Sequence, residues 1–488
     1  MAIDVDTPEG KAFKNLARML HERRTGRAGG RIWDLESTKT SDLRPGLDLL
    51  HDYRRGDPPL SKVHAGWKPY VRQFVRTGRL NIADLLICST RNRMDLRDFR
   101  TSAADDELGD AEARKIMRAS GLTIVATDVH DYFLSYGDGY TMTTPPAKSG
   151  EPAIITAEDP RFTITADDPV TGRPKYGYKA FRDDWDSADL AYVFFPGGVV
   201  RRAIKKGRTT FTTGTFRFDK SGWEWDDTYG SNGSQTMPGG RFPIVHFENE
   251  RGVGEFEEHL DTLNRINDKI FNEWWISKIQ AFRQRAVKNL PDTDEATGEE
   301  IDYTDMFTAS PDEMWQVPGD VEFWESAAVD VGSIVTSIQK DLERLAAAKS
   351  QPLHTITPDA ANGSAEGASL MREEHLYKVG NRIARVNPRW AETMSLAFAF
   401  QGDSERADVT QIEGIWGPIQ RYSLEAQADF LSKVGDKLPL EAIWTDILQY
   451  APAEVPNLRT LRGRDLLFAA RQAALAAPPA PPAPAAGQ

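Results

Sequence analysis

A long helical pattern that begins at Gly254 constrains the fold of this chain more than any other feature. Within residues 254–289, apolar residues recur at helical spacing on two stripes. The first stripe holds Phe256, Leu260, Leu263, Ile270 and Trp274, and the second holds Ile276, Ile279 and Phe282. A helix of about thirty residues spans about 50 Å, which exceeds what a small domain needs. Both stripes therefore need neighbours, and these can lie in other subunits.

A long, almost uncharged segment separates two further helical patterns. Residues 350–370, SQPLHTITPDAANGSAEGASL, contain two prolines, two glycines and an asparagine. The helix predicted before it carries Val331, Ile334, Val335, Ile338, Leu342 and Leu345 on one face. The helix predicted after it has Ser364 as N-cap and a stripe of Leu376, Val379, Ile383 and Val386. Compact domains usually join helices with about two to eight residues, so a connection this long is either functional or disordered.

The first half of the chain predicts a mixture of helices and strands. TPEGKAFKNLARMLHERR predicts a helix with Thr7 as N-cap and Pro8 in its first turn. Helical patterns follow at residues 66–93 and 110–120, whereas residues 124–134 fit either a helix or a strand. Short strands are predicted within AIITAEDPRFTIT, YGYKAFRD, LAYVFFPGGVV, TFTTGTFRF and FPIVHF, and a polar loop over residues 219–240. The region to about residue 249 is therefore expected to be α+β.

An acidic insert interrupts the helical half. Residues 291–325 carry many carboxylates and contain no Lys or Arg, and MWQVPGDVEFW within them predicts a strand pair or hairpin. The carboxylates lack the spacing of a calcium-binding loop. A solvated acidic face or a docking surface is the preferred interpretation, and a divalent-metal site is the alternative.

Composition narrows the class of protein. At 488 residues the chain is too long for one core, so two to four folded units are expected. The formal net charge of -13 argues against a protein that coats nucleic acid. Basic runs at residues 21–31, 201–208 and 459–464 are interpreted as solvated surface. The single Cys88, the absence of a signal peptide and the absence of a long apolar run favour a reducing compartment and no membrane span.

A search for catalytic motifs finds almost nothing. The sequence contains no GxxxxGK[ST], HExxH, GxSxG or CxxC. Cys88 is interpreted as structural rather than nucleophilic. His51 and His130 each lie near an aspartate and could form a metal pair, but local hydrogen bonding explains them better. We therefore expect no enzyme activity, no cofactor and no metal.

The order of these parts resembles the portal proteins of tailed bacteriophages, in the branch found in long-tailed phages. The similarity covers about residues 47–471. It is carried by LDLLHDYRRGDPPL, by VHDYFLSYGDGYTMT, by PGGRFPIVHFENERGVGEFEEHLDTLNRINDKI, and most strongly by the run from FWESAAVDVGS to EEHLYKV, residues 323–379. The series of segments in order, rather than any single motif, carries the likeness.

The resemblance implies an α+β fold of portal type, with an α/β wing, a two-helix stem, a small α/β clip, a tunnel loop, a long wing helix and a helical crown. The implied parts are an N-terminal arm (1–46), wing (47–253), first stem helix (254–289), clip (290–328), second stem helix (329–349), tunnel loop (350–363), long wing helix with return segment (364–423), crown (424–474) and an Ala/Pro-rich disordered tail (475–488).

The resemblance also implies sites and partners. The residues expected to face DNA from the tunnel loop are Ser350, Gln351, His354, Thr355, Thr357, Asp359, Asn362 and Gly363. The residues expected to form the docking surface of the clip are Asp292, Asp294, Glu295, Glu299, Glu300, Asp302 and Asp305. The implied partners are further copies in a ring of twelve, double-stranded DNA passing without sequence specificity, the terminase large subunit, a head-tail adaptor, and the major capsid and scaffolding proteins. The implied location is a vertex of the virion capsid, reached from the host cytoplasm during assembly.

Two other functions stay open on the sequence. One is a different virion structural protein, such as a minor head or adaptor protein, although these tend to be shorter. The other is a metal-dependent cytosolic hydrolase that uses the carboxylates of residues 292–325. An acidic conduit would repel phosphates and hold DNA without gripping it, which agrees with the net charge of -13.

Overall fold

The computed structural model describes most of the chain, in two compact units. The described residues are 3–26, 44–59, 69–103, 109–206, 222–281, 285–289, 293, 298, 300, 322–325, 330–352, 365–420, 424–434, 437–451 and 454–476. Unit 1 comprises Met1–Asp48, Ile87–Gly254 and His375–Gln488, and unit 2 comprises Leu49–Leu86 and Glu255–Glu374. Among the described residues, no helix combines the length and the apolar character that crossing a membrane requires.

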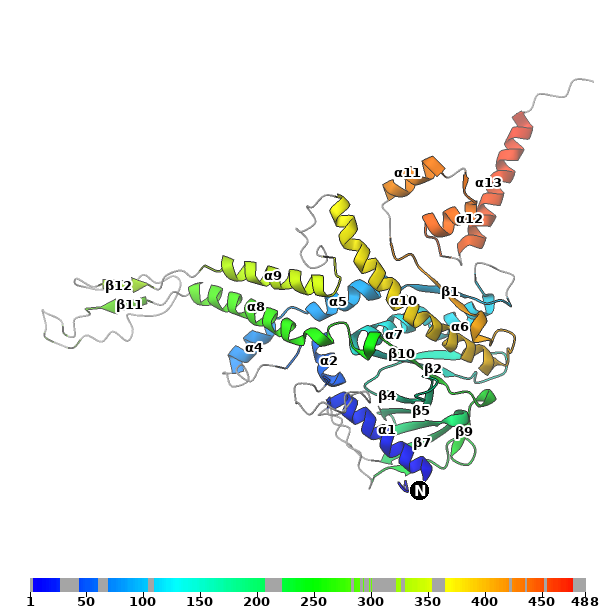
Figure 1. The fold of residues 1–488 in the computed structure, drawn as a ribbon, viewed down its shortest axis with the longest axis horizontal. Helices are drawn as coiled ribbons and strands as arrows, with labels where there is room; N and C mark the ends of the chain where they lie inside the picture. Colours follow the sequence, from blue (N-terminus) through cyan, green and yellow to red (C-terminus); the bar gives the residue numbers. More distant parts are fainter. Residues whose placement is uncertain are drawn as a thin grey trace, which may run out of the picture. The chain divides into compact units, whose positions relative to one another are not determined.

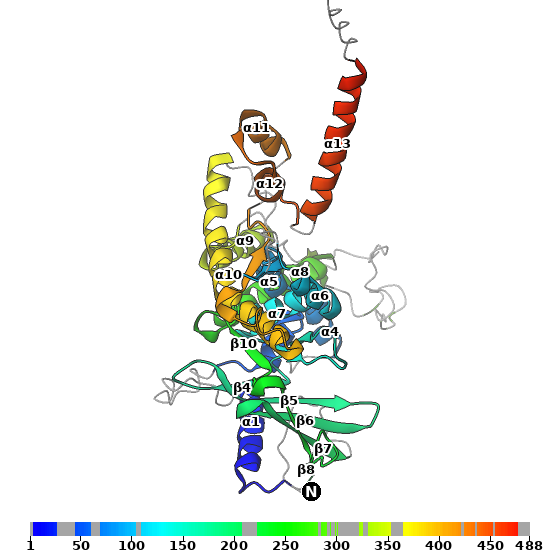
Figure 2. The same cartoon turned by 90° about the vertical axis from the view of Figure 1, so that its right-hand side faces the viewer.

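Helix α1 (Pro8–Thr25) forms as its sequence predicts. The Thr7 side chain accepts a hydrogen bond from the backbone N–H of Gly10 at 3.1 Å, and Pro8 occupies the first turn. The helix buries Phe13, Leu16 and Leu20. Figure 2 shows α1 beside the larger sheet of unit 1, which these side chains cover.

The larger sheet of unit 1 is antiparallel and mostly built from consecutive strands. Its order is β4 (Thr163–Asp167), β5 (Pro174–Asp183), β6 (Ala188–Phe195), β7 (Val199–Lys206) and β8 (Glu224–Trp225), and β9 (Ser234–Thr236) also pairs with β7. Phe13 of α1 lies edge-on to Tyr178 of β5, with ring centroids 5.6 Å apart. It makes similar contacts with Trp223 and Trp225, so aromatic packing fixes α1 on this sheet.

The smaller sheet of unit 1 has the order β10 (Ile244–Glu248), β2 (Asp138–Thr144) and β3 (Ile154–Glu158). Helices α6 (Ala111–Ser120) and α7 (Leu122–Tyr136) pack against it, as does the part of α10 (Ala365–Gln401) that belongs to unit 1. Gly137 ends α7 with φ 79°, and a Cβ there would lie 2.2 Å from the Gly252 carbonyl oxygen. Only glycine can make this turn from helix to strand.

The remaining elements of unit 1 are a two-stranded sheet and the C-terminal helices, which the sequence predicted as helical. Strand β1 (Leu96–Arg100) pairs with β13 (Glu413–Trp416), and α11 (Leu424–Val434), α12 (Leu440–Ala442) and α13 (Val455–Ala476) come after it. Several apolar side chains of α13 stay exposed, among them Leu467 and Phe468.

Unit 2 is built around two antiparallel helices. These are α8 (Leu260–Ala281) and α9 (Gly332–Ala348), which lie side by side in Figure 1. Strand β11 (Arg285–Lys288) follows the C-terminus of α8, and strand β12 (Glu322–Glu325) precedes the N-terminus of α9. The two strands form a two-stranded antiparallel ribbon. Helix α4 (Pro69–Thr77) and the unit 2 parts of α2 (Leu47–Arg54), α5 (Ile82–Arg91) and α10 complete the unit.

The combination of helices and antiparallel sheets agrees with the predicted α+β class. The predicted bounds of several helices and strands need correction. The helix predicted over residues 254–289 is shorter than expected. A turn and a 3-10 segment (Glu257–His259) precede α8, and Arg285–Lys288 forms β11 instead of continuing the helix. The helical pattern over residues 66–93 is divided between α4 and α5. The predicted polar loop contains β8 and β9. Glu322–Glu325 pairs with β11, and the rest of the predicted hairpin, residues 314–321, lies outside the described residues. Residues 124–134 are helical, within α7.

In two of the three basic runs, described arginines are buried or paired rather than solvated. Arg23 and Arg24 are buried, and Arg23 donates to the Tyr136 carbonyl oxygen at 2.8 Å. The run that starts at Arg201 forms strand β7, where Arg201 pairs with Glu9 and stacks over the Trp225 ring at 4.2 Å. On α13, by contrast, the described arginines of the third run are exposed.

Candidate functional site

One buried carboxylate links α8 to α9. Asp341 of α9 keeps 3% of its side-chain surface exposed. It accepts hydrogen bonds from Lys269 Nζ at 2.7 Å and from Arg265 Nε at 3.0 Å, both on α8. Arg344, one turn further along α9, lies 3.3 Å away. Two cationic side chains of α8 therefore bind the single carboxylate of Asp341 on α9.

The electrostatics of Asp341 follow from these partners. The hydrogen bond from Lys269, aided by Arg265 and opposed by burial, lowers the pKa of Asp341 to about 2. Lys269 also donates to the Ser337 hydroxyl at 2.7 Å, which lies one turn before Asp341 on α9. The carboxylate thus stays charged across the physiological range, and the contact persists there.

Apolar side chains close the seam on either side of this cluster. Leu263, Ile266 and Phe271 of α8 are buried, as are Ile338 and Leu345 of α9. Phe271 stacks on Trp275 with ring centroids 5.8 Å apart. Val335, which the sequence placed on the same face, is 36% exposed. The predicted stripe of α9 is therefore only partly covered within one chain.

The segment after α9 is anchored at its start. Ser350 adopts φ 51°, and its hydroxyl donates to Glu374 at 2.8 Å. Gln351 is 5% exposed, and its amide donates to the Leu86 carbonyl oxygen at 3.2 Å. The Gln351 side chain is thus held inside unit 2, and its predicted contact with DNA stays a prediction.

The other predicted tunnel-loop residues lie outside the described part of the chain. They are His354, Thr355, Thr357, Asp359, Asn362 and Gly363. The contacts of Ser350 and Gln351 show where this segment leaves unit 2. The DNA-facing role of the remaining residues stays a prediction.

The predicted clip surface is described at one residue only. Glu300 is exposed and forms an isolated bridge with Thr293. Asp292, Asp294, Glu295, Glu299, Asp302 and Asp305 lie outside the described residues. Strand β11 ends before the predicted clip boundary, and β12 forms the last four residues of the acidic insert. The structure therefore shows which strands lie at the two ends of the insert. The docking role of the insert stays a prediction.

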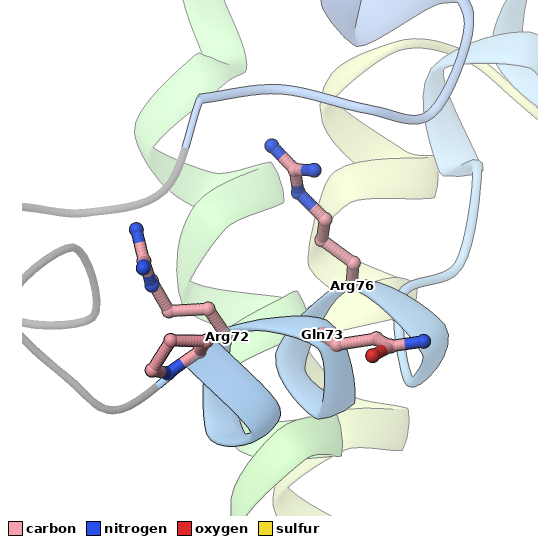
Figure 3. Close-up of a pocket in the computed structure, with 4 residues that line it drawn as sticks. Arg72, Gln73 and Arg76 are labelled. Atoms are coloured by element: carbon pink, nitrogen blue, oxygen red, sulfur yellow. The ribbon is translucent and has the colours of Figure 1, made fainter.

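A cationic face of α4 lies in the same unit. Arg72, Gln73, Arg76 and Pro69 line a hollow of about 440 Å³. Figure 3 shows Arg72 and Arg76 projecting from the same side of the helix. Arg76 is loosely paired with Asp57 at 3.7 Å and remains largely exposed. The sequence analysis did not single out this face, although the four-residue spacing of its arginines was visible there.

Of the two histidines considered as a metal pair, His130 is a core residue of unit 1. His130 is buried, accepts a hydrogen bond from Trp390 Nε1 at 3.0 Å, and stacks on Trp416. Burial lowers the pKa of His130 to about 3, so it is a neutral core residue. Within the described ranges, no group of three or more His, Cys, Asp or Glu side chains is arranged to hold a metal ion.

A third histidine forms a charged cluster that the sequence analysis missed. His246 of β10 lies between Asp167 at 2.9 Å and Asp138 at 3.1 Å. Burial alone would lower the pKa of His246, but the two carboxylates raise it to about 9. Arg23 lies 3.5 Å from Asp138 and completes an alternating set of charges. No local pattern predicts this cluster because its members are far apart in sequence.

Comparisons with known proteins give distant structural neighbours. No protein-family profile matches the sequence, and no curated protein does either. One solved structure to which the chain is similar is the neck of an empty gene transfer agent particle computed with C6 symmetry, at 13% identity and TM-score 0.42, covering 77% of this chain and 87% of that one. A second is the virion of the native gene transfer agent particle, at 14% identity and TM-score 0.40, covering 76% and 90%. A third is the neck of the native particle computed with C12 symmetry, at 14% identity and TM-score 0.41, covering 80% and 89%.

Proposed function

We propose that this chain is one subunit of a ring-shaped portal through which double-stranded DNA enters and leaves a virus-like particle. The observation that carries the proposal is the order of parts around the Asp341 cluster. The antiparallel helices α8 and α9 are held together by hydrogen bonds to Asp341. The ribbon of β11 and β12, with the acidic insert, connects the C-terminus of α8 to the N-terminus of α9. The chain after α9 continues into the 37-residue helix α10.

This arrangement suits a conduit. A helix pair fixed by a buried ion cluster is stiff and can line or frame a passage. The net charge of -13 is repeated in every copy of a ring, so the assembly repels the phosphate backbone. DNA would then pass without sequence-specific contacts and without tight binding.

The remaining parts of the proposal follow from this role. The chain carries no phosphate-binding loop motif, so the portal would be a passive channel and the terminase large subunit would supply the motor. The clip of residues 290–328, which contains the acidic insert, would dock the motor and later a head-tail adaptor. Major capsid and scaffolding proteins would surround the ring at one capsid vertex, and assembly would start from it in the host cytoplasm.

Negative-stain electron microscopy with native mass spectrometry tests the proposal. Rings with a central hole and a mass near twelve subunits are expected. A protein that stays monomeric or dimeric at micromolar concentration, alone and with its scaffolding protein, would contradict the portal role.

A further inference from the structure

The turn between β5 and β6 exposes a tryptophan. Trp185 is 94% exposed, although an aromatic side chain normally buries roughly 150–250 Å². The turn that carries it is ordered by hydrogen bonds. Asp183 accepts from the backbone N–H of Trp185 at 2.9 Å and from that of Asp186 at 3.4 Å. The indole is therefore held out by a defined turn.

The surroundings of Trp185 are acidic. Asp183 and Asp184 precede it and Asp186 follows it. The Asp184 side chain is 93% exposed and meets Arg182 at 3.2 Å. A large apolar ring in an acidic setting matches an apolar hollow with a basic rim. Tryptophan is also among the residues that most often dominate the energy of protein interfaces.

Unit 1 contains such a hollow at the other end of β5. It has a volume of about 440 Å³ and is lined in part by Pro174, Phe242, Ile244, Leu396 and Val409. Arg173 and Arg241 also line it, and both side chains are exposed. The hollow thus combines apolar side chains with two guanidinium groups and with the carboxylates of Glu392 and Asp408.

The carboxylates of the hollow already have partners. Glu392 pairs with Arg389 at 3.0 Å, and Asp408 accepts hydrogen bonds from the backbone N–H and the hydroxyl of Thr410. Arg241 donates only to the neutral Ser395 hydroxyl, at 3.3 Å. Neither Arg173 nor Arg241 forms an ion pair with any carboxylate that the structure describes. The two arginines are therefore available to an acidic partner.

These complementary features lie at opposite ends of one strand. Pro174 lines the hollow and Asp183 begins the turn, which places them about 30 Å apart at roughly 3.3 Å per residue. One copy cannot fill its own hollow, but a neighbouring copy can. We propose that the Trp185 turn of one subunit inserts its indole into the hollow beside Arg173 and Arg241 of the next subunit. Such a head-to-tail contact repeats from copy to copy and closes into a ring when the rotation permits.

This inference rests on the proposed ring and names one of its contacts. A double variant with Ser187→Cys and Val409→Cys, in a Cys88→Ser background, tests it directly, because it keeps the indole and places a thiol two residues away in the same exposed turn. Mild oxidation of the assembled protein should produce a ladder of disulfide-linked oligomers on a non-reducing gel, while either cysteine alone should not. Tyr377→Ser, which removes another aromatic of unit 1 that is 73% exposed, should leave the ladder unchanged.

The outcomes separate this contact from the portal role. Rings without cross-linking would overturn the contact and leave the portal proposal standing. Cross-linked open chains without rings would support the contact and contradict the portal proposal. The absence of both would overturn both, and a dimer from Ser187→Cys alone would replace the head-to-tail contact with a symmetric one.

A charge exchange provides a second measurement. Asp184→Lys with Asp186→Lys should raise the concentration needed for half-assembly at least tenfold, as should Arg173→Glu with Arg241→Glu. Asp183 is left intact because it orders the turn. Combining all four substitutions should restore assembly. A combined variant no better than either pair alone would count against the contact.

Discussion

Lys269 of α8 donates a hydrogen bond to Asp341 of α9 at 2.7 Å, in the buried seam between the two helices. This contact joins residues 72 positions apart and fixes how the two helices meet. Because a single anion serves Lys269, Arg265 and Arg344, its removal would leave several cations uncompensated at once.

Asp341→Ala should therefore destabilise unit 2. Removing one partner of a buried ion pair costs about 3–5 kcal/mol, but Arg265 is 53% exposed and water screens part of the loss. We expect a decrease of about 1–3 kcal/mol in the free energy of unfolding, measured by chemical denaturation. Glu343→Ala, on the exposed face of the same helix, is the matched control and should change little. Equal effects of the two substitutions would show that Asp341 does not hold the pair.

The His246 cluster should make unit 1 less stable at alkaline pH. The pKa of His246 is raised to about 9, above its ordinary value of 6.5, so the folded state binds its proton more tightly. Its stabilisation is complete below pH 6.5 and is lost as the pH rises through 9, by on the order of 2–3 kcal/mol. Thermal unfolding between pH 6.5 and 9.5 measures this loss.

His246→Gln should flatten that alkaline slope. His259→Gln should not, because burial and then the nearby Lys349 lower the pKa of His259 and move its titration below this range. An alkaline slope that survives in His246→Gln would assign it to other groups.

His130 should produce the opposite trend at acid pH. Burial lowers its pKa to about 3, so the unfolded chain takes up a proton first as the pH falls below 6.5. Unit 1 should lose stability between pH 6.5 and 3, and His130→Asn should reduce that acid loss while lowering stability at neutral pH. Unfolding curves recorded at pH 4 and pH 7 for both proteins give the comparison. An unchanged acid slope would argue against a neutral, buried imidazole.

The cap of α1 offers a smaller and more local test. Thr7→Ala removes the acceptor for the Gly10 N–H and should cost about 1 kcal/mol in the free energy of unfolding. Thr7→Ser keeps the hydroxyl and should retain most of the stability. If Thr7→Ser were as destabilising as Thr7→Ala, the hydroxyl would not be the source of the effect.

The segment between α9 and α10 should matter for DNA passage rather than for folding. Replacing residues 353–363 with a shorter glycine-serine linker should leave ring formation and melting temperature unchanged, because Ser350 and Gln351 keep their contacts. The amount of DNA packaged per particle should fall. Wild-type packaging by particles built from the shortened chain would contradict a tunnel-loop role.

The sequence by itself determined the elements whose stabilising contacts are local. Helix α1 was predicted with its cap because Thr7, Pro8 and the apolar stripe lie within a few turns of one another. The same holds for α6, for α9 and for the helical C-terminus. The α+β class followed from the change of period near residue 152, since strands and helices place apolar residues at different spacings.

The sequence did not show which charged residues are buried, because partners that are distant in sequence decide whether a charged side chain is exposed or paired. The basic run at Arg201 was interpreted as solvated surface, yet it forms strand β7, with Val200 and Ala203 buried and Arg201 paired with Glu9. Val200 and Ala203 lie on opposite faces of β7, so no simple alternation marks the strand, and arginine can bury its stem while its head finds a partner. The end of α8 was also placed too late, since β11 forms only by pairing with β12, more than thirty residues further along the chain.

The charged clusters were decided by the tertiary structure alone. Asp138 and Asp167 reach His246 from strands that are distant in sequence, and Asp341 meets its cations only when α8 and α9 pack together. A carboxylate on a helix looks the same in sequence whether it faces water or a buried lysine. The energy of such a contact depends on burial and on distance, and both exist only after the chain has folded.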